Sequence, residues 1–132
     1  MTDELRADIA AAAERMRWKM GSRREIKRLE QYLWEGEAVQ RMTSGYYGKG
    51  NGLIVLTDQR LFFLQDGWLS QTTEDFPLSR ISSVQWSSGI ATGSIIVFAS
   101  GNKADIKNVL KDDGREIVDL IRARLSGHAS GL

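Results

Sequence analysis

The chain has 132 residues, which is enough for one domain with a hydrophobic core that needs no disulfide or structural metal. Its hydrophobic fraction of 42% and charged fraction of 27% are those of a globular protein, and no apolar run approaches the roughly 20 residues of a membrane-spanning helix. The net charge of +1 excludes a strong overall attraction to nucleic acid or anionic lipid, and the absence of cysteine fits a reducing, cytoplasmic compartment.

The first 34 residues predict an N-terminal extension of two helices. Apolar residues recur at helical spacing from Leu5 to Met16, and Gly21 interrupts this pattern. The segment from Ser22 to Glu25 has the form of a capping box, which predicts a second helix over about 23–33.

From residue 36 the apolar period changes from 3.6 to 2, which predicts strands. The expected strands cover about 37–44, 53–57, 60–65, 68–76, 81–87, 94–99 and 104–109. The glycine-rich segment 45–52 is expected to be a flexible loop between the first two strands, and Pro77 is expected to end the fourth. Many short strands joined by short turns are typical of a barrel or a sandwich.

A helical period returns after the last expected strand. Ile117, Leu120, Ile121 and Leu125 form one apolar stripe. A second capping box over residues 113–116 predicts a helix of about 114–126. The sequence therefore predicts a mostly β, α+β domain over residues 35–126, whose helix closes the barrel, and a disordered tail over 127–132.

Three segments of the expected barrel are distinctive: residues 36–39, residues 52–63 with a Thr-x-x-Arg turn, and residues 76–84. They resemble the bacterial pleckstrin-homology-like (PH-like) domains, specifically the YokE-like group, within the wider GRAM and PH superfold. The resemblance covers about two-thirds of the chain. It implies a seven-stranded antiparallel barrel capped by a C-terminal helix, and a bacterial or phage protein that binds partners.

The Thr-x-x-Arg turn consists of Thr57 and Arg60, which we interpret as a structural corner. Thr57 is expected to bond a backbone group of the turn, and Arg60 to bond a carbonyl of a neighbouring strand or an acid.

The sequence contains no pattern typical of an enzyme. His128 is the only histidine, so a histidine-activated nucleophile and a histidine metal cluster are not expected. The glycine-rich segment lacks the Gly-Lys-Ser/Thr sequence that opens a helix in phosphate-binding loops. The acidic pairs at 74–75 and 112–113 are explained as a strand end and a helix start. We therefore expect no catalysis, cofactor, metal or small-molecule substrate.

Two groups of residues are candidates for contact with a partner or with lipid. The first is the basic segment 15–28, which interleaves cations with apolar residues, and the second is the expected loop tip. The candidates are Arg15, Arg17, Trp18, Lys19, Arg23, Arg24, Lys27, Tyr46, Tyr47 and Lys49. In eukaryotic PH domains several basic residues of the first strand pair hold a phosphoinositide head group. Here Lys49 stands alone in the loop with Arg41 upstream, which does not favour that specificity.

The sequence leaves two functions open. The first is a non-catalytic adaptor that acts in protein–protein interaction or self-assembly, for which a peptide-binding groove between barrel and helix is one option. The alternative is a peripheral adaptor at the inner membrane face, which binds anionic lipid through the basic N-terminal helices. Those helices are expected either to pack on the barrel or on a second copy, or to project as an interaction arm. Nucleic acid is not an expected partner.

Overall fold

The computed structural model describes residues 4–18 and 22–130 of the chain, the last three by their backbone alone. Within these residues seven strands form one antiparallel sheet in the order β4-β3-β2-β1-β7-β6-β5. The strands are β1 (Val39–Tyr47), β2 (Gly50–Thr57), β3 (Arg60–Asp66), β4 (Gln71–Pro77), β5 (Ile81–Ser88), β6 (Thr92–Ala99) and β7 (Asn102–Leu110). The helix α3 (Lys111–Ser130) follows them. The predicted PH-like α+β fold is confirmed.

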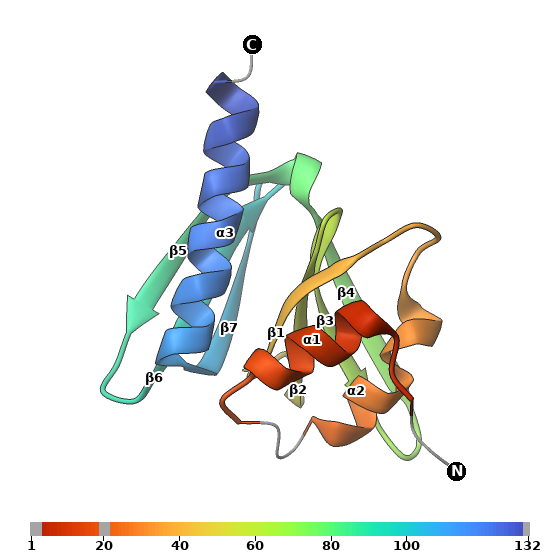
Figure 1. Ribbon diagram of the computed structural model, residues 1–132. Coiled ribbons are helices and arrows are strands. Elements are labelled where there is room, and N and C mark those ends of the chain that lie inside the picture. Colours follow the sequence, from red (N-terminus) through yellow and green to blue (C-terminus); the bar gives the residue numbers. More distant parts are fainter. Residues whose placement is uncertain (1–3, 19–21, 131–132) are drawn as a thin grey trace.

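The sheet divides into two halves that meet at one point. Strands β1 to β4 form the first half and β5 to β7 the second, and β1 pairs with β7 at Tyr46 and Lys107. The short 3-10 helix η2 (Leu78–Arg80) connects β4 to β5. Figure 1 shows α3 lying across the second half, where it covers the inner face.

The inner core lies between the two half-sheets and α3. Alternate residues of β2 and β3, such as Ile54 and Phe63, pack there with Ile95, Ile106 and Ile117. The predicted apolar stripe of the C-terminal helix thus faces the barrel, because Ile117 and Ile121 are fully buried and Leu120 and Leu125 pack against the same core.

A second, outer core lies on the opposite face of the first half-sheet. The helices α1 (Ala7–Arg15) and α2 (Arg23–Arg28) and the 3-10 helix η1 (Leu29–Tyr32) cover this face (Figure 1). The residues that meet there are Ile9, Ala12, Ala13, Met16, Ile26 and Leu29 from the extension and Val39, Met42, Leu53, Val55, Phe62 and Leu64 from the strands. The N-terminal extension therefore packs on the barrel.

Both predicted capping boxes are wrong. The Ser22 side chain makes no capping bond; it bonds the hydroxyl of Ser44 instead, and the Glu25 carboxylate accepts from the backbone N–H of Asp66 at 3.1 Å. Asp113 lies inside α3, which begins earlier, at Lys111. In both cases the side chains that the local pattern assigned to a helix end form hydrogen bonds with residues distant in sequence instead.

The glycine-rich segment 45–52 is not a loop. β1 continues to Tyr47 and β2 begins at Gly50, so most of the segment is a paired hairpin, with Tyr47 opposite Gly50. Gly48 has a φ of +64°, which permits the tight turn. The closing helix ends at Ser130 and thus also includes part of the predicted tail.

Candidate functional site

The Thr57–Arg60 turn is a hydrogen-bonded corner between β2 and β3. Thr57 Oγ1 accepts from the backbone N–H of Gln59 and of Arg60, both at 3.0 Å, and donates to Glu37 Oε2 at 2.6 Å. Because Thr57 and Arg60 are both buried, this corner is closed to a partner.

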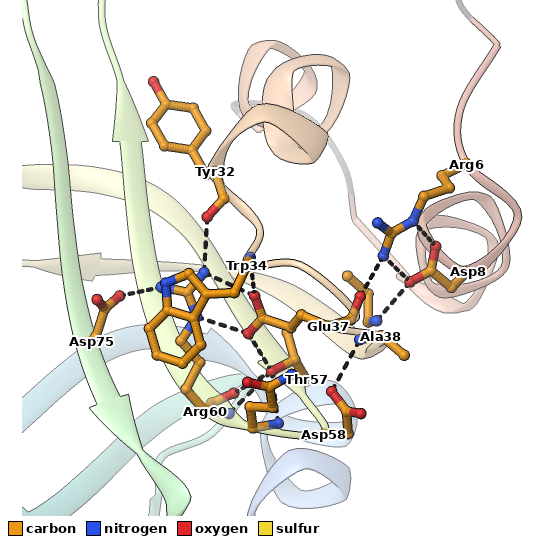
Figure 2. Close-up of polar contacts among 12 residues, drawn as sticks. Arg6, Asp8, Tyr32, Trp34, Glu37, Ala38, Thr57, Asp58, Arg60 and Asp75 are labelled. Carbon is orange, nitrogen blue, oxygen red and sulfur yellow. Dashed lines mark hydrogen bonds and ion pairs between the residues drawn. The ribbon is translucent and has the colours of Figure 1, made fainter.

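Arg60 lies at the centre of a buried polar network, which Figure 2 shows. Its guanidinium donates to both carboxylate oxygens of Glu37, to Asp75 Oδ1 at 2.6 Å and to the carbonyl of Tyr32 at 2.8 Å. The indole of Trp34 stacks over it, 3.9 Å from the guanidinium carbon. Three of these bonds hold Tyr32 and Glu37, on either side of the connection from η1 to β1, against the corner, and the fourth joins the corner to β4.

Glu37 remains ionised inside this network. Burial opposes its charge, but hydrogen bonds from Arg60, Thr57 and the backbone N–H of Trp34 outweigh that cost and lower the pKa of Glu37. An ion pair with saturated hydrogen bonds is a structural element and leaves no free group for chemistry.

The first candidate cations, Arg15 and Arg17, are paired with the start of α3. Arg15 donates to Glu116 Oε2 at 3.0 Å, and the Arg17 side chain lies 3.4 Å from Asp112 Oδ2. The backbone N–H of Arg17 donates to Asp113 at 3.3 Å. Trp18 is 55% exposed, and Lys19 lies outside the described residues.

Two carboxylates of α3 differ in their electrostatics. Burial is the largest influence on Glu116, yet hydrogen bonds from Arg41 and Arg15 outweigh it and lower the pKa of Glu116. Burial dominates at Asp113, so its pKa is raised despite the contacts from Arg17.

The second group of candidate cations, Arg23, Arg24 and Lys27, lies on α2. Arg24 Nε donates to Asp66 Oδ1 at 3.0 Å, and the Tyr32 hydroxyl donates to Asp66 Oδ2 at 2.7 Å. Burial opposes the charge of Asp66, but these bonds outweigh it and lower the pKa of Asp66. Arg23 and Lys27 are exposed.

The third group of candidates, Tyr46, Tyr47 and Lys49, lies on the β1–β2 hairpin. Tyr47 packs edge-on against Phe63 and donates its hydroxyl to Glu74 Oε2 at 3.0 Å; burial and this bond raise its pKa to about 12. Tyr46 is 39% exposed, and Lys49 lies in the turn. A hollow of about 280 Å³ opens beside Tyr47 and Lys49.

The three groups therefore do not form one site. Arg15 and Arg17 meet α3, Arg24 of α2 meets Asp66 at the end of β3, and Tyr47 lies with Lys49 at the hollow, which we call the barrel mouth. Among the described residues no cluster of three or more metal-ligating side chains occurs. In the acidic pair 74–75, Glu74 accepts a hydrogen bond from the Tyr47 hydroxyl and Asp75 accepts one from the Arg60 guanidinium.

Sequence reasoning missed two surface features. The first is the outer edge of β5, which pairs with no further strand in the described part of the chain and whose residues 81–88 include no charge and no proline. The second is the β3–β4 hairpin tip, where Trp68 and Leu69 are 86% and 89% exposed. The absence of charge over residues 81–88 could have predicted an edge strand that is open to further pairing. The exposed hairpin tip was not predicted because the fourth strand was expected to begin at Trp68, whereas β4 begins at Gln71.

The comparisons with known proteins agree with this architecture. A family model described as "Bacterial PH domain" matches residues 33–123, and the chain belongs to this family. A solved structure titled "Vps36 N-terminal PH domain" is similar at 23% identity and a TM-score of 0.51, over 71% of this chain and 86% of that one. No curated protein matches. The YokE-like group remains a prediction.

PH domains commonly mediate protein or lipid binding, and their fold is typically non-catalytic. None of the helices in the described part of the chain combines the length and the apolar character that crossing a bilayer requires.

Proposed function

We propose that the protein is a non-catalytic, cytoplasmic adaptor whose barrel binds an extended segment of a protein partner along β5, beside α3. The observation that supports this most directly is the contrast between the two edges of the sheet. β4 carries Glu74, Asp75 and Pro77, which are residues that protect an edge from further pairing. β5 has the sequence ISSVQWSS and lacks all of these protections.

A strand added to β5 would lie beside α3. Arg122 Nε of α3 donates to the carbonyl of Val84 at 3.3 Å, so one backbone acceptor of β5 already takes a bond from outside the sheet. A hollow of about 220 Å³ lies where η2 and β5 meet the last turns of α3, lined by Leu78, Ile81 and Leu125 among others. Main-chain bonds to β5 would supply affinity, and this hollow would take one apolar side chain of the segment.

Selection from a displayed library of random peptides on the full-length chain tests this proposal. We expect peptides that slow hydrogen exchange of the β5 amides. Lysines at Gln85 and Ser87 should weaken their binding about tenfold, about 1.4 kcal/mol. Lysines at Gln71 and Thr72, on the already polar edge strand β4, are the matched control and should leave the affinity unchanged. Peptides that protect only the barrel mouth at Tyr47, or no enriched peptide at all, would contradict the proposal.

Self-assembly by the same edge is a second form of this function. In that form β5 of one copy would pair with β5 of another, and the lysine variant at Gln85 and Ser87 would convert a dimer to a monomer. Light scattering of the full-length chain over a range of concentrations separates the two forms.

A further inference from the structure

The tip of the β3–β4 hairpin exposes two large apolar side chains that the barrel does not use. Trp68 and Leu69 are adjacent and 86% and 89% exposed. The backbone N–H of Gly67 donates to the carbonyl of Ser70 at 2.8 Å and closes the turn that presents them. Scattered single exposed apolar residues are ordinary, whereas contiguous exposed apolar surface marks interaction sites, and these two neighbours together form such a surface.

The helix beside this tip has a purely cationic surface. α2 has the sequence RREIKR, and its two buried residues are Glu25 and Ile26. Every exposed side chain of α2 is therefore basic: Arg23, Arg24, Lys27 and Arg28.

Asp66 fixes α2 beside the tip. It is the last residue of β3, immediately before the turn, and Arg24 and Arg28 lie 3.0 Å and 3.9 Å from its Oδ1. Two guanidiniums face this one buried carboxylate. The pairing therefore holds the helix in place, while the positive charge of α2 exceeds the negative charge of Asp66. In Figure 1 the hairpin turn lies at the lower right, next to α2.

We propose that α2 and the β3–β4 tip together form a docking surface for an anionic lipid bilayer. Trp68 and Leu69 enter the interfacial layer while the α2 cations lie among the lipid phosphates. The attraction is to surface charge and needs no head-group pocket, so this surface is separate from the barrel mouth at Tyr47 and Lys49. It is also separate from the proposed peptide edge β5, and an adaptor with both would bring a partner to a membrane.

A bilayer matches both halves of this surface. Nucleic acid would match the α2 cations but would leave Leu69 without an apolar contact. A protein partner would have to offer an apolar pocket surrounded by acids, whereas a bilayer supplies apolar interior and negative charge along its whole surface. α2 also lies outside residues 33–123, so the surface depends on a segment that the family match does not include.

Co-sedimentation of the full-length chain with lipid vesicles tests the proposal. The vesicles are phosphatidylcholine alone, or phosphatidylcholine with phosphatidylserine, at low and at high salt. We expect binding to the serine-containing vesicles at low salt, and its loss in high salt or without phosphatidylserine. No binding, or equal binding to both kinds of vesicle, would overturn the proposal.

Variants assign the binding to this surface. Changing Arg23 and Lys27 to Gln should lower the partition coefficient about thirtyfold, since each cation contributes about 1 kcal/mol near an anionic surface. Changing Trp68 and Leu69 to Ser should abolish binding. The matched controls are Ile90→Ser at another hairpin tip and Arg80→Gln with Arg115→Gln, which remove exposed cations elsewhere; both should bind as the wild type does.

Tryptophan quenching by brominated acyl chains reports which residue enters the bilayer. Quenching should disappear in Trp68→Phe and persist in Trp18→Phe. Quenching that disappears only in Trp18→Phe would place the inserted residue in the segment between α1 and α2 and would overturn this assignment. Because none of these variants alters β5, their failure would leave the peptide-binding proposal intact.

Discussion

The two half-sheets of this barrel differ in what covers their outer faces. Strands β1 to β3 bury apolar side chains on both faces, with Ile54 and Phe63 in the inner core and Val55 and Phe62 beneath the N-terminal helices. Strands β5 and β6 bury mainly one face. The first half-sheet therefore needs a cover and the second does not.

This difference assigns a structural purpose to the N-terminal extension. The family match begins at residue 33, yet the outer face of the matched strands is apolar and is buried by residues that precede it. We propose that residues 1–34 belong to the same folding unit as the barrel, although the sequence pattern marks them as a separate segment.

Removal of residues 1–32 is the strongest test of that idea. The truncated chain would expose the strand side of the outer core, including Val55, Phe62 and Leu64. Burial of one such side chain contributes about 1.5–3 kcal/mol, whereas a whole domain is stable by only about 5–15 kcal/mol. We expect loss of cooperative thermal unfolding, measured by circular dichroism, together with aggregation in light scattering.

Removal of residues 129–132 is the matched control, because it also shortens the chain at one end. That variant should unfold cooperatively near the wild-type temperature. A monomeric chain 33–132 with the wild-type melting temperature would show that the outer face is stable without its cover.

The same substitution in each half-sheet sharpens the comparison. Phe62 is 1% exposed in the outer core, while Phe98 is half-buried on the outer face of the second half-sheet. Phe62→Ala should lower the free energy of unfolding by about 3–5 kcal/mol, and Phe98→Ala by less than about 1.5 kcal/mol. Urea denaturation measures both, and equal losses would contradict the proposed asymmetry.

The apolar patterns allowed much of this fold to be predicted, and two of them also indicate which face of the sheet is covered. The continuous runs at 53–56 and 61–64 are typical of strands buried on both faces, whereas β5 has polar residues on both sides of Val84 and Trp86. β6 also has a continuous run, over 95–98, but its Ile96 and Phe98 are only partly buried. The first pattern already indicated that something covers β2 and β3. The amphipathic helices before residue 34 were the segments available to do so.

The polar contacts could not be predicted in the same way. Ser22 and Glu25 have the spacing of a capping box, but Ser44 and Asp66 lie close enough in the folded chain to bond them instead. The cationic segment 15–28 suggested one basic surface. Folding divides it, because Arg15 meets Glu116 and Arg24 meets Asp66, and these acids are distant in sequence.

The docking of α1 has an acid-sensitive component at Asp8. Arg6 donates two hydrogen bonds to the Asp8 carboxylate, and the backbone N–H of Val39 at the start of β1 donates a third at 2.7 Å. The bond from Arg6 is the main cause that lowers the pKa of Asp8 to about 2, from an ordinary value of 3.8. A lowered pKa in the folded state stabilises above the ordinary value, and that stability is lost as the pH falls from about 4 to about 2.

Asp8→Asn should therefore cost on the order of 2 kcal/mol at neutral pH and less and less as the pH falls toward about 2. Urea denaturation at several pH values measures the difference between wild type and variant, which removes the contribution of other acids. Asp119→Asn, an exposed change on α3, is the control and should shift the unfolding free energy little. A difference between Asp8→Asn and wild type that does not change between pH 2 and pH 4 would show that the carboxylate charge is not what holds α1 to β1.

The smallest effect is expected from the ion pair that joins α1 to α3. The Arg15 and Glu116 side chains are 51% and 42% exposed, so water screens their attraction. A double-mutant cycle with Arg15→Gln and Glu116→Gln should give a coupling energy below about 1 kcal/mol that decreases in high salt. This value would mean that the apolar face of the first half-sheet keeps the extension docked. A coupling above about 2 kcal/mol would instead make the ion pair a principal attachment, and the truncation result would then reflect the loss of α1's contact with α3 as well as the loss of a cover.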